Sequence, residues 1–475
     1  MVNDQDQRAA FLSALGAIVG AAQVLHEGDL SAWERDWRKR WQGKALAVVR
    51  PGNTGEVAQV VRLCALRRVS IVPQGGNTGL VGGGVPDATG SQVVLSLSRM
   101  NTVRAIDRSN LAITAEAGCV LQAVQQAADE AELLFPLSLA AEGSCTLGGN
   151  LGTNAGGTQV LRFGNARDLC LGLEVVTAAG EVWNGLSGLR KDNTGYDLRH
   201  LMIGSEGTLG IITAATMKLF ARPAASLTAL AACATLPDCV TLLSLAQGRL
   251  AAGLTGFEII SDFAMSLVRK HFNQLPQPLA PAPWTVLLEY ADTEGIEPAQ
   301  ARFEALLEAA MAQGTISDAA VAQSVAQSKA MWALRESIPL AQSVEGLNIK
   351  HDISVPVSAI PAFVARTDAA IQAAVPGAQM VNFGHLGDGN LHYNVQAPQG
   401  QAAAEFLARH EHTINTIVYD QVQACGGSFS AEHGVGVLKL GDMAQRKSPV
   451  ALDMMRAIKH ALDPLGTLNP GRVVV

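Results

Sequence analysis

Two patterns of apolar residues alternate between about residues 45 and 219 of the chain. Short runs rich in Val, Ile and Leu predict buried strands, and apolar residues spaced three or four apart predict helices. The expected helices are 56–68, with Thr54 as the N-cap, and 121–132. The expected strands are 45–49, 69–72, 93–97, 103–106, 111–116 and 209–219, with a hairpin at 174–183.

A coarser alternation of strands and helices follows Pro223, which is the expected domain boundary. Strands are predicted at 227–235, 254–260 and 284–291, and helices at 237–252, 261–272, 297–313, 328–340, 401–424 and 449–462. The pattern therefore predicts an α+β protein in which a second domain (223–475) begins at this proline.

One short segment, 384–392, reads Gly-His-Leu-Gly-Asp-Gly-Asn-Leu-His. An Asp-Gly pair between extended residues predicts a hairpin with a two-residue turn, because both turn positions need positive φ. In that register His385 faces His392, with Cβ atoms about 4.5–5.5 Å apart, and Asn394 shares their face. The two imidazoles are thus placed to bind one metal ion. The alternative is a polar hairpin with two surface histidines.

Composition narrows the class of protein. A chain of 475 residues with 48% hydrophobic and 16% charged residues is expected to form more than one buried core. A net charge of −7 argues against a nucleic-acid surface. Seven cysteines without a Cys-x-x-Cys pair argue against iron–sulfur and zinc-finger sites and favour reduced thiols in the cytoplasm. The apolar stretch 11–25 follows two aspartates, so a helix is favoured over a signal peptide, and no apolar run is long enough to span a membrane.

Three glycine-rich loops, 73–84, 143–157 and 204–210, follow or precede predicted strands. Glycines let backbone N–H groups approach phosphate oxygens. The loops match neither the Rossmann nor the Walker pattern. No lysine stands in the first two loops to meet a terminal phosphate, so a pyrophosphate bridge fits better than a triphosphate. The loops therefore indicate a dinucleotide, and the alternative is a set of structural turns.

The three loops, the hairpin, Glu432-His433-Gly434 and the ending 462–471 together resemble the vanillyl-alcohol-oxidase/PCMH flavoprotein superfamily. Within it the chain resembles the FAD-linked D-2-hydroxyacid dehydrogenases, which act on D-2-hydroxyglutarate, D-lactate or glycolate. The resemblance covers about residues 25–475. It implies an N-terminal helical segment (1–41), a PCMH-type FAD-binding domain of two α+β subdomains (42–222), a ferredoxin-like α+β substrate domain (223–475), and a C-terminal helical segment that returns to the flavin.

The resemblance also implies which residues bind FAD. Those expected at the pyrophosphate are Pro73, Gly75, Gly76, Asn77, Thr78 and Gly79. Those expected to line the flavin are Gly143, Ser144, Gly148, Gly149, Asn150, Thr153, Asn154 and Ala155. Glu206 and Ile211 are expected near the ribose and adenine, and Asn469 near the isoalloxazine. The first two loops contain no matching attachment histidine, so FAD is expected to be noncovalent.

A metal site at His385 and His392 needs a third, anionic ligand, and the resemblance assigns Glu432 to this role. Two histidines and one carboxylate with an open position suit Zn²⁺, with Mn²⁺ and Fe²⁺ as alternatives. A metal that binds the substrate's hydroxyl and carboxylate lowers the hydroxyl pKa. The resemblance implies His433 as the base that removes the hydroxyl proton.

Arg335, Lys350 and Asn394 match substrate-binding positions of the family. Pro339 is a departure, because members that act on D-2-hydroxyglutarate can carry a hydroxyl residue there; Ser337 or Asn348 are candidate substitutes. D-2-hydroxyglutarate is favoured, with D-lactate and a subunit of a glycolate-oxidising complex as alternatives. A zinc hydrolase is a further alternative, but it leaves the glycine loops unexplained. The family implies an electron-transfer flavoprotein, quinone or cytochrome as acceptor, and a homodimer is expected.

Overall fold

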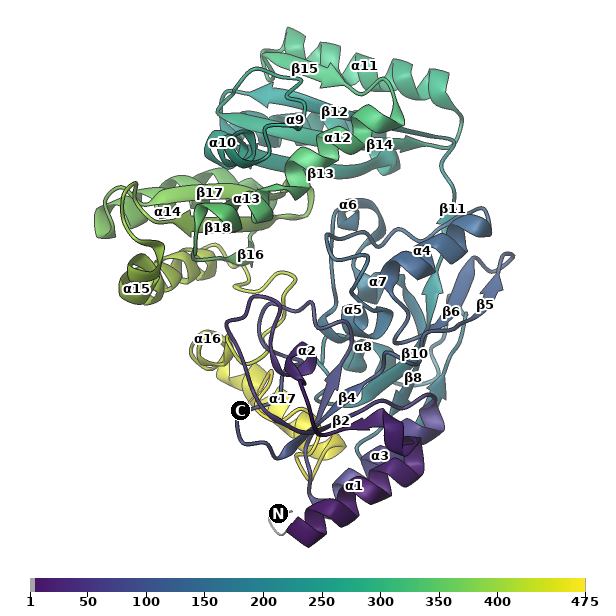
Figure 1. Ribbon diagram of the computed structural model, residues 1–475. Coiled ribbons are helices and arrows are strands. Elements are labelled where there is room, and N and C mark those ends of the chain that lie inside the picture. Colours follow the sequence, from purple (N-terminus) through teal and green to yellow (C-terminus); the bar gives the residue numbers. More distant parts are fainter. Residues whose placement is uncertain (1–4, 475) are drawn as a thin grey trace. The chain divides into compact units, whose positions relative to one another are not determined.

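The computed structural model describes residues 5–474 (Figure 1). The chain forms two compact units. Unit 1 contains the chain up to Gly157, Gly164–Arg222 and the C-terminal part from His433. Unit 2 contains Thr158–Phe163 and Pro223–Glu432. The chain therefore returns to unit 1 between Glu432 and His433.

The first sheet of unit 1 has the strand order β1-β2-β4-β3. Its strands are β1 (Val24–Leu25), β2 (Ala45–Val49), β3 (Ile71–Gln74) and β4 (Gln92–Ser96). β2 and β3 both pair in parallel with β4. Parallel strands need a crossover connection, which α3 (Thr54–Arg67) provides between β2 and β3.

The N-cap of helix α3 lies one residue earlier than expected. Asn53 is the N-cap, and its side chain accepts a hydrogen bond from the Glu56 N–H. Thr54 is already helical, and its hydroxyl donates to Glu174 over 2.6 Å. The prediction of Thr54 as the cap was wrong, because an Asn at the preceding position performs the same function.

The second sheet of unit 1 is antiparallel, in the order β5-β6-β10-β8-β9. Its strands are β5 (Val103–Asp107), β6 (Ala112–Glu116), β8 (Cys170–Val176), β9 (Val182–Gly185) and β10 (Ile211–Lys218). The predicted hairpin around Ala179-Gly180 is confirmed as β8–β9. A small ribbon pairs β7 (Leu133–Leu134) with β11 (Phe220–Ala221).

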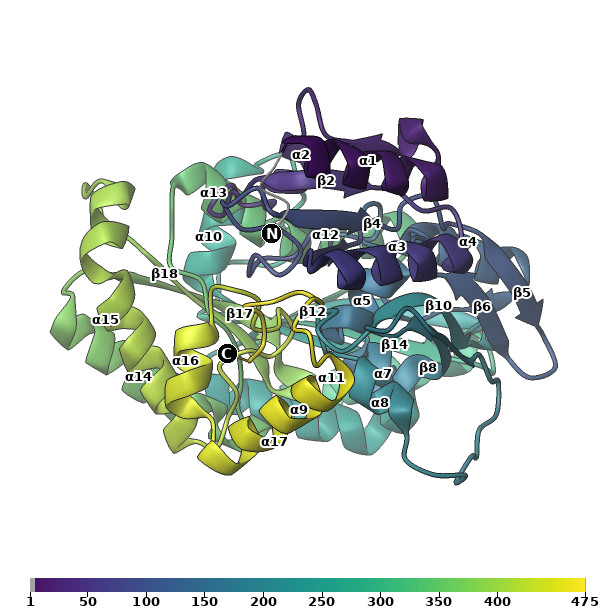
Figure 2. The same ribbon diagram turned by 90° about the horizontal axis from the view of Figure 1, so that it is seen from below.

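Within residues 5–474, further α-helices complete unit 1 and the link to unit 2. They are α1 (Gln5–Val19), α2 (Ser31–Glu34), α4 (Leu121–Glu130), α5 (Leu147–Thr153), α6 (Val160–Phe163), α7 (Ala166–Leu169), α8 (Leu198–Met202), α16 (Leu440–Arg446) and α17 (Pro449–Leu462). Of these, α6 belongs to unit 2. Helix α1 packs on α3 and β2 (Figure 2).

Unit 2 is built on a seven-stranded sheet in the order β15-β12-β14-β13-β17-β18-β16, in which all pairs are antiparallel. The strands are β12 (Ala225–Cys233), β13 (Leu254–Ser261), β14 (Trp284–Asp292), β15 (Asp318–Val321), β16 (Asp352–Ser354), β17 (Gln379–His385) and β18 (Asn390–Gln396). The helices are α9 (Leu236–Leu250), α10 (Asp262–His271), α11 (Ile296–Ala312), α12 (Val325–Glu336), α13 (Ile338–Glu345), α14 (Ile360–Ala374) and α15 (Ala403–Ala424).

Helices cover both faces of this sheet, because its strands bury alternate residues on opposite sides. Phe257 and Ile259 of β13 join a core that includes buried residues of α9, α11, α14 and α15. Ile260 joins a second core with residues of α10, α12 and α13. The side chain of Glu258 therefore points to the α12 side of the sheet.

The single helix expected at 328–340 is two helices, α12 and α13, which meet at Ser337. Pro339 is in the first turn of α13. Proline has no N–H and is tolerated in the first turn but not in a helix interior, so the first helix ends before it. Within residues 5–474, no helix has the length and apolar character to cross a bilayer.

Candidate active site

The two histidines of the hairpin lie on the same face of the unit 2 sheet. The observed register pairs Phe383 with His392, not His385 with His392. The turn is longer than expected, since residues 386–388 form a 3₁₀ turn before Gly389, which has φ 86°. The predicted direct opposition was therefore wrong. The shift equals two residues on a period of two, so both histidines keep the expected face.

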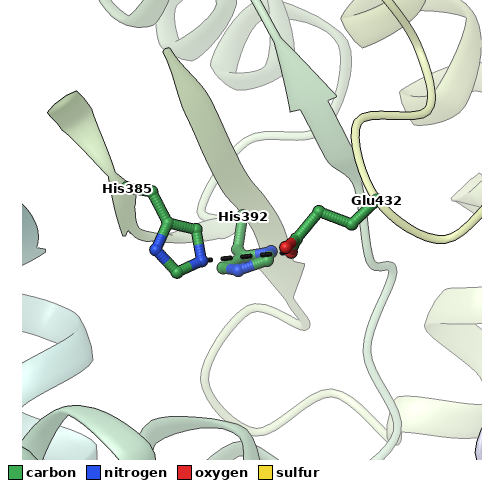
Figure 3. Close-up of side chains that lie close together, drawn as sticks. All are labelled: His385, His392 and Glu432. Carbon is green, nitrogen blue, oxygen red and sulfur yellow. Dashed lines mark ion pairs between the residues drawn. The ribbon is translucent and has the colours of Figure 1, made fainter. Parts of the chain in front are cut away.

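Three potential metal ligands converge at this point (Figure 3). The imidazole centroids of His385 and His392 are 5.5 Å apart, and His385 Nε2 is 3.9 Å from Glu432 Oε2. One ligand atom from each residue lies within 4.8 Å of the others. A tetrahedral zinc ion with bonds of about 2.1 Å holds its ligands about 3.4 Å apart. The donor set therefore suits a divalent ion, and the most distant ligand atoms would move up to about 1.4 Å closer together to bind it.

Sheet register explains how Glu432 reaches the histidines. Asp352 of β16 pairs directly with His392. Its Oδ2 accepts a hydrogen bond from the Glu432 N–H over 2.8 Å, and its Oδ1 accepts from Asn390 over 3.0 Å. Asp352 is 2% exposed. A buried carboxylate on the edge strand therefore anchors the backbone of the third ligand beside the first two.

Sequence reasoning missed Glu258, which contacts two of the predicted site residues. Glu258 pairs with His385 across β13 and β17. Its Oε1 accepts from His385 Nδ1 over 2.5 Å and its Oε2 accepts from Arg335 Nε over 2.7 Å. Its side chain is 0% exposed. A single charged residue inside a largely apolar strand was the available sign of this role.

The pKa values of Glu258 and His385 depend strongly on their neighbours in this hydrogen-bonded series. Burial alone would disfavour the charge on Glu258, but His385 and Arg335 lower the pKa of Glu258 to about 2. Burial likewise opposes a charge on His385, and Glu258 overcomes it to raise the pKa of His385 to about 9. The hydrogen bond at Nδ1 leaves Nε2 as the atom that faces Glu432.

The predicted substrate residues lie around the metal ligands in the same unit. The Arg335 guanidinium lies over the Phe383 ring at 4.8 Å, and that ring is 4.9 Å from the His392 ring. Asn394 is buried, donates to Gln342 and accepts from the His351 N–H. Lys350 lies in the segment next to β18, between Ile349 and His351. Their roles in substrate binding stay predictions.

The glycine-rich loops line a pocket in unit 1. The predicted cofactor residues that line it are Pro73, Gly75, Gly76, Asn77, Thr78, Gly79, Gly148, Gly149, Asn150, Thr153, Glu206 and Ile211. Gly143, Ser144, Asn154, Ala155 and Asn469 are outside the lining. Residues that sequence reasoning missed include Asp36, Thr146 and Gly207; only Thr146, the N-cap of α5, carried a local sign.

The pocket fits a large phosphate-bearing cofactor. A Cβ at Gly75 would lie 2.3 Å from the Thr146 hydroxyl, and one at Gly76 would lie 1.9 Å from the Ser144 carbonyl oxygen. The first two loops therefore approach so closely that only glycine is accommodated. The amide nitrogen of Asn150 is buried and has no hydrogen-bond partner among residues 5–474, so a bound cofactor would give it one.

His433 lines the same pocket, and Glu206 holds the turn that follows it. The Glu206 carboxylate accepts from the N–H groups of Val435 and Gly436 over 2.7 and 2.8 Å. Burial raises its pKa against the effect of these two donors. Asn469 donates to the backbone carbonyls of Gly83 and Glu206. Glu206 and Asn469 thus fix the C-terminal segment on the glycine loops.

Comparisons with known proteins agree with this arrangement. A family model described as FAD binding domain matches residues 45–185. A second, described as FAD linked oxidases, C-terminal domain, matches residues 222–473. The two matches define the class of protein, an FAD-linked oxidase.

Similar proteins narrow the class. D-2-hydroxyglutarate dehydrogenase of Xanthomonas citri pv. viticola is 42% identical over 97% of this chain and 96% of its own. The mitochondrial D-2-hydroxyglutarate dehydrogenase of Danio rerio is 38% identical over 97% of this chain and 84% of its own. The chain accordingly belongs to the D-2-hydroxyglutarate dehydrogenase family of FAD-dependent oxidoreductases.

Solved structures confirm the PCMH-type α+β fold. p-Cresol methylhydroxylase matches 99% of this chain and 97% of its own with a TM-score of 0.76 at 18% identity. 4-Ethylphenol oxidase from Gulosibacter chungangensis matches 99% of this chain and 98% of its own with a TM-score of 0.75 at 18% identity. At this identity the likeness concerns the fold alone.

Proposed function

We propose that this FAD-dependent dehydrogenase oxidises D-2-hydroxyglutarate to 2-oxoglutarate and that a divalent metal, zinc by preference, binds at His385, His392 and Glu432. The observation that carries the proposal is the hydrogen-bonded series Arg335–Glu258–His385, which brings Arg335 next to the three proposed ligands. Relatives that bear the name of this activity support the substrate.

In this proposal the chain's own groups bind the substrate and move its proton. Arg335 uses Nε for Glu258, and among residues 5–474 its Nη atoms make no hydrogen bond. They are the donors for a substrate carboxylate. His433 takes the proton from the substrate hydroxyl, since an imidazole has the right reference pKa for a base near neutral pH. Lys350 and Asn394 are the remaining proposed contacts.

Each cofactor supplies one part of the chemistry. Bound noncovalently on the glycine loops, FAD would accept the hydride from C2. A divalent ion on the two imidazoles and the carboxylate would bind the hydroxyl and carboxylate oxygens of the substrate and acidify the hydroxyl. With FAD and metal in these places, the residues match the chemical demands of 2-hydroxyacid oxidation.

Pro339 keeps D-lactate as a second candidate substrate. It removes one side-chain donor from the start of α13, and the amide nitrogen of the expected substitute Asn348 donates to Gln342 and Gly346. D-lactate has no second carboxylate, so the missing donor weakens its binding less than that of D-2-hydroxyglutarate. An electron-transfer flavoprotein, quinone or cytochrome as acceptor, a homodimer and a cytoplasmic location also remain proposals.

Anaerobic reduction of the flavin tests the function. The visible spectrum of purified protein is followed while D-2-hydroxyglutarate, D-lactate, glycolate and the L-isomers are added. We expect D-2-hydroxyglutarate to bleach the flavin fastest. Faster bleaching by D-lactate selects the second candidate. Bleaching only by L-isomers, or a protein without flavin, contradicts the proposal.

A further inference from the structure

The fully buried carboxylate of Glu258 lies between two groups with different proposed tasks. Oε1 accepts from Nδ1 of the metal ligand His385, and Oε2 accepts from Nε of the substrate residue Arg335. The two partners are 127 and 77 residues away along the chain. Each oxygen thus accepts one hydrogen bond, and both bonds depend on the position of the same carboxylate.

We propose that Glu258 is a positioning residue that orients His385 toward the metal and Arg335 toward the substrate carboxylate at the same time. The inference rests on the proposed function, because it assigns Glu258 to the metal and substrate sites described there. Imidazole ligands usually donate their second N–H to a carboxylate, which fixes the tautomer and the ring orientation. At His385 this leaves Nε2, which faces Glu432, as the nitrogen whose lone pair can bind the metal once its proton is lost.

The chemistry of an amide makes this arrangement testable. Glu258 has to accept two hydrogen bonds from two donors, whereas a glutamine side chain offers one accepting oxygen and one donating NH₂ group. If the amide oxygen serves Arg335, its NH₂ faces His385 Nδ1. Nδ1 then has to be the accepting atom, the proton moves to Nε2, and the lone pair for the metal is lost.

Glu289 offers a matched control on the neighbouring strand. It lies on β14, where its carboxylate accepts from the Thr255 hydroxyl over 2.8 Å and from Trp332 Nε1 over 3.0 Å. A hydroxyl can both donate and accept, so a glutamine at this position keeps both hydrogen bonds. Glu289 contacts none of the three proposed ligands through these bonds, and Glu289→Gln reports only on the cost of a buried amide.

A double variant separates the shared carboxylate from simple packing. In Glu258→Gln/Arg335→Met the competing donor is absent. The introduced amide can then direct its oxygen to His385 Nδ1 and restore the ligating tautomer. We therefore expect the second substitution to recover metal affinity that the first has removed, although it also removes the proposed substrate anchor.

The experiment measures zinc affinity on full-length, metal-stripped protein by competition with a chromophoric chelator. Flavin absorbance and thermal unfolding are recorded for every variant. Glu258→Gln is expected to bind zinc 10–100-fold more weakly than the wild type, Glu289→Gln to stay within about twofold, and the double variant to match Arg335→Met within about threefold.

Several results would overturn the inference. Unchanged affinity in Glu258→Gln does so, and so does a double variant that binds zinc as weakly as Glu258→Gln. If Glu258→Gln cannot be purified, a tenfold weaker affinity of the double variant than of Arg335→Met has the same meaning, and equal affinities support the inference. Wild-type protein that binds no divalent metal refutes the proposed metal site itself, a result distinct from the others.

Discussion

The close approach of the first two glycine loops leads to a prediction for Gly76→Ala. An added Cβ would lie 1.9 Å from the Ser144 carbonyl oxygen and 2.9 Å from its carbon. Real Cβ contacts are essentially never shorter than 3.0 Å. Because both atoms belong to backbone, no side-chain rotation relieves the clash, and the two loops have to separate.

The magnitude follows from the cost of inserting one methyl group into a packed region, about 1–3 kcal/mol. If the loops stay together in the apoprotein, that cost lowers its free energy of unfolding. If they separate, the cost is paid when FAD draws them together, and the affinity for FAD falls by a factor of about 5 to 150. One of the two quantities has to change.

The assay titrates FAD into apoprotein and follows flavin fluorescence, and the unfolding free energy of the apoprotein is measured in denaturant. Gly79→Ala is the control, because an added Cβ at this position of the same loop has no atom of the described part of the chain (5–474) within 4 Å. It should leave the apoprotein as stable as the wild type. The reasoning is refuted if Gly76→Ala changes neither quantity, or if Gly79→Ala destabilises the apoprotein equally.

Further predictions concern the chemistry and the stability of unit 1. Treatment with EDTA should abolish flavin reduction by D-2-hydroxyglutarate while the flavin spectrum persists, and added zinc should restore it; undiminished reduction after verified metal removal would contradict the metal's role. His433→Asn should slow anaerobic reduction about 10²–10⁴-fold without loss of FAD, and a normal rate would exclude His433 as the base. Burial raises the pKa of Glu174, but hydrogen bonds from Thr54, Arg104 and Thr213 hold it below its usual value. Its charged form therefore stabilises the fold above pH 4.5 and less as the pH falls below that value. Glu174→Gln should lower the unfolding free energy at pH 7 by about 1–3 kcal/mol, with the difference from wild type shrinking in acid; a pH-independent difference would contradict this.

The fold was predictable where one residue type determines local geometry. Asp388-Gly389 places a turn after β17, and Pro223 lies two residues before the start of β12. Turn length was not predictable, because the 3₁₀ turn at 386–388 depends on tertiary contacts. One of these is Leu161, whose side chain lies 2.8 Å from where a Gly387 Cβ would be. The prediction that both histidines lie on one face was still correct, because the actual register differs from the expected one by two residues. A difference of one residue would have placed them on opposite faces.

Helix boundaries in unit 2 show the limit of periodicity. The pattern of apolar residues runs through 328–340 without interruption, yet α12 ends at Glu336 and α13 begins at Ile338. Pro339 was visible in the sequence, but its use as a first-turn residue of a new helix requires knowing that Ser337 ends the previous one. The break matters for the site, since Arg335 lies in the last turn of α12.

Glu258 shows why a site residue can be visible in a sequence and still have no assignable role. Glu258 is the one charged residue of strand 254–260, and burial of an isolated carboxylate costs several kcal/mol unless opposite charge and hydrogen bonds compensate it. The sequence therefore demanded a cationic partner for Glu258, but it offered 35 Lys and Arg residues without indicating which one. Sheet pairing resolves the choice: β17 places His385 opposite Glu258, and α12 on that face supplies Arg335. A buried charge in a predicted strand therefore indicates that a residue of opposite charge from another element contacts it. For Glu258 these contacting residues are the proposed metal ligand His385 and the proposed substrate anchor Arg335.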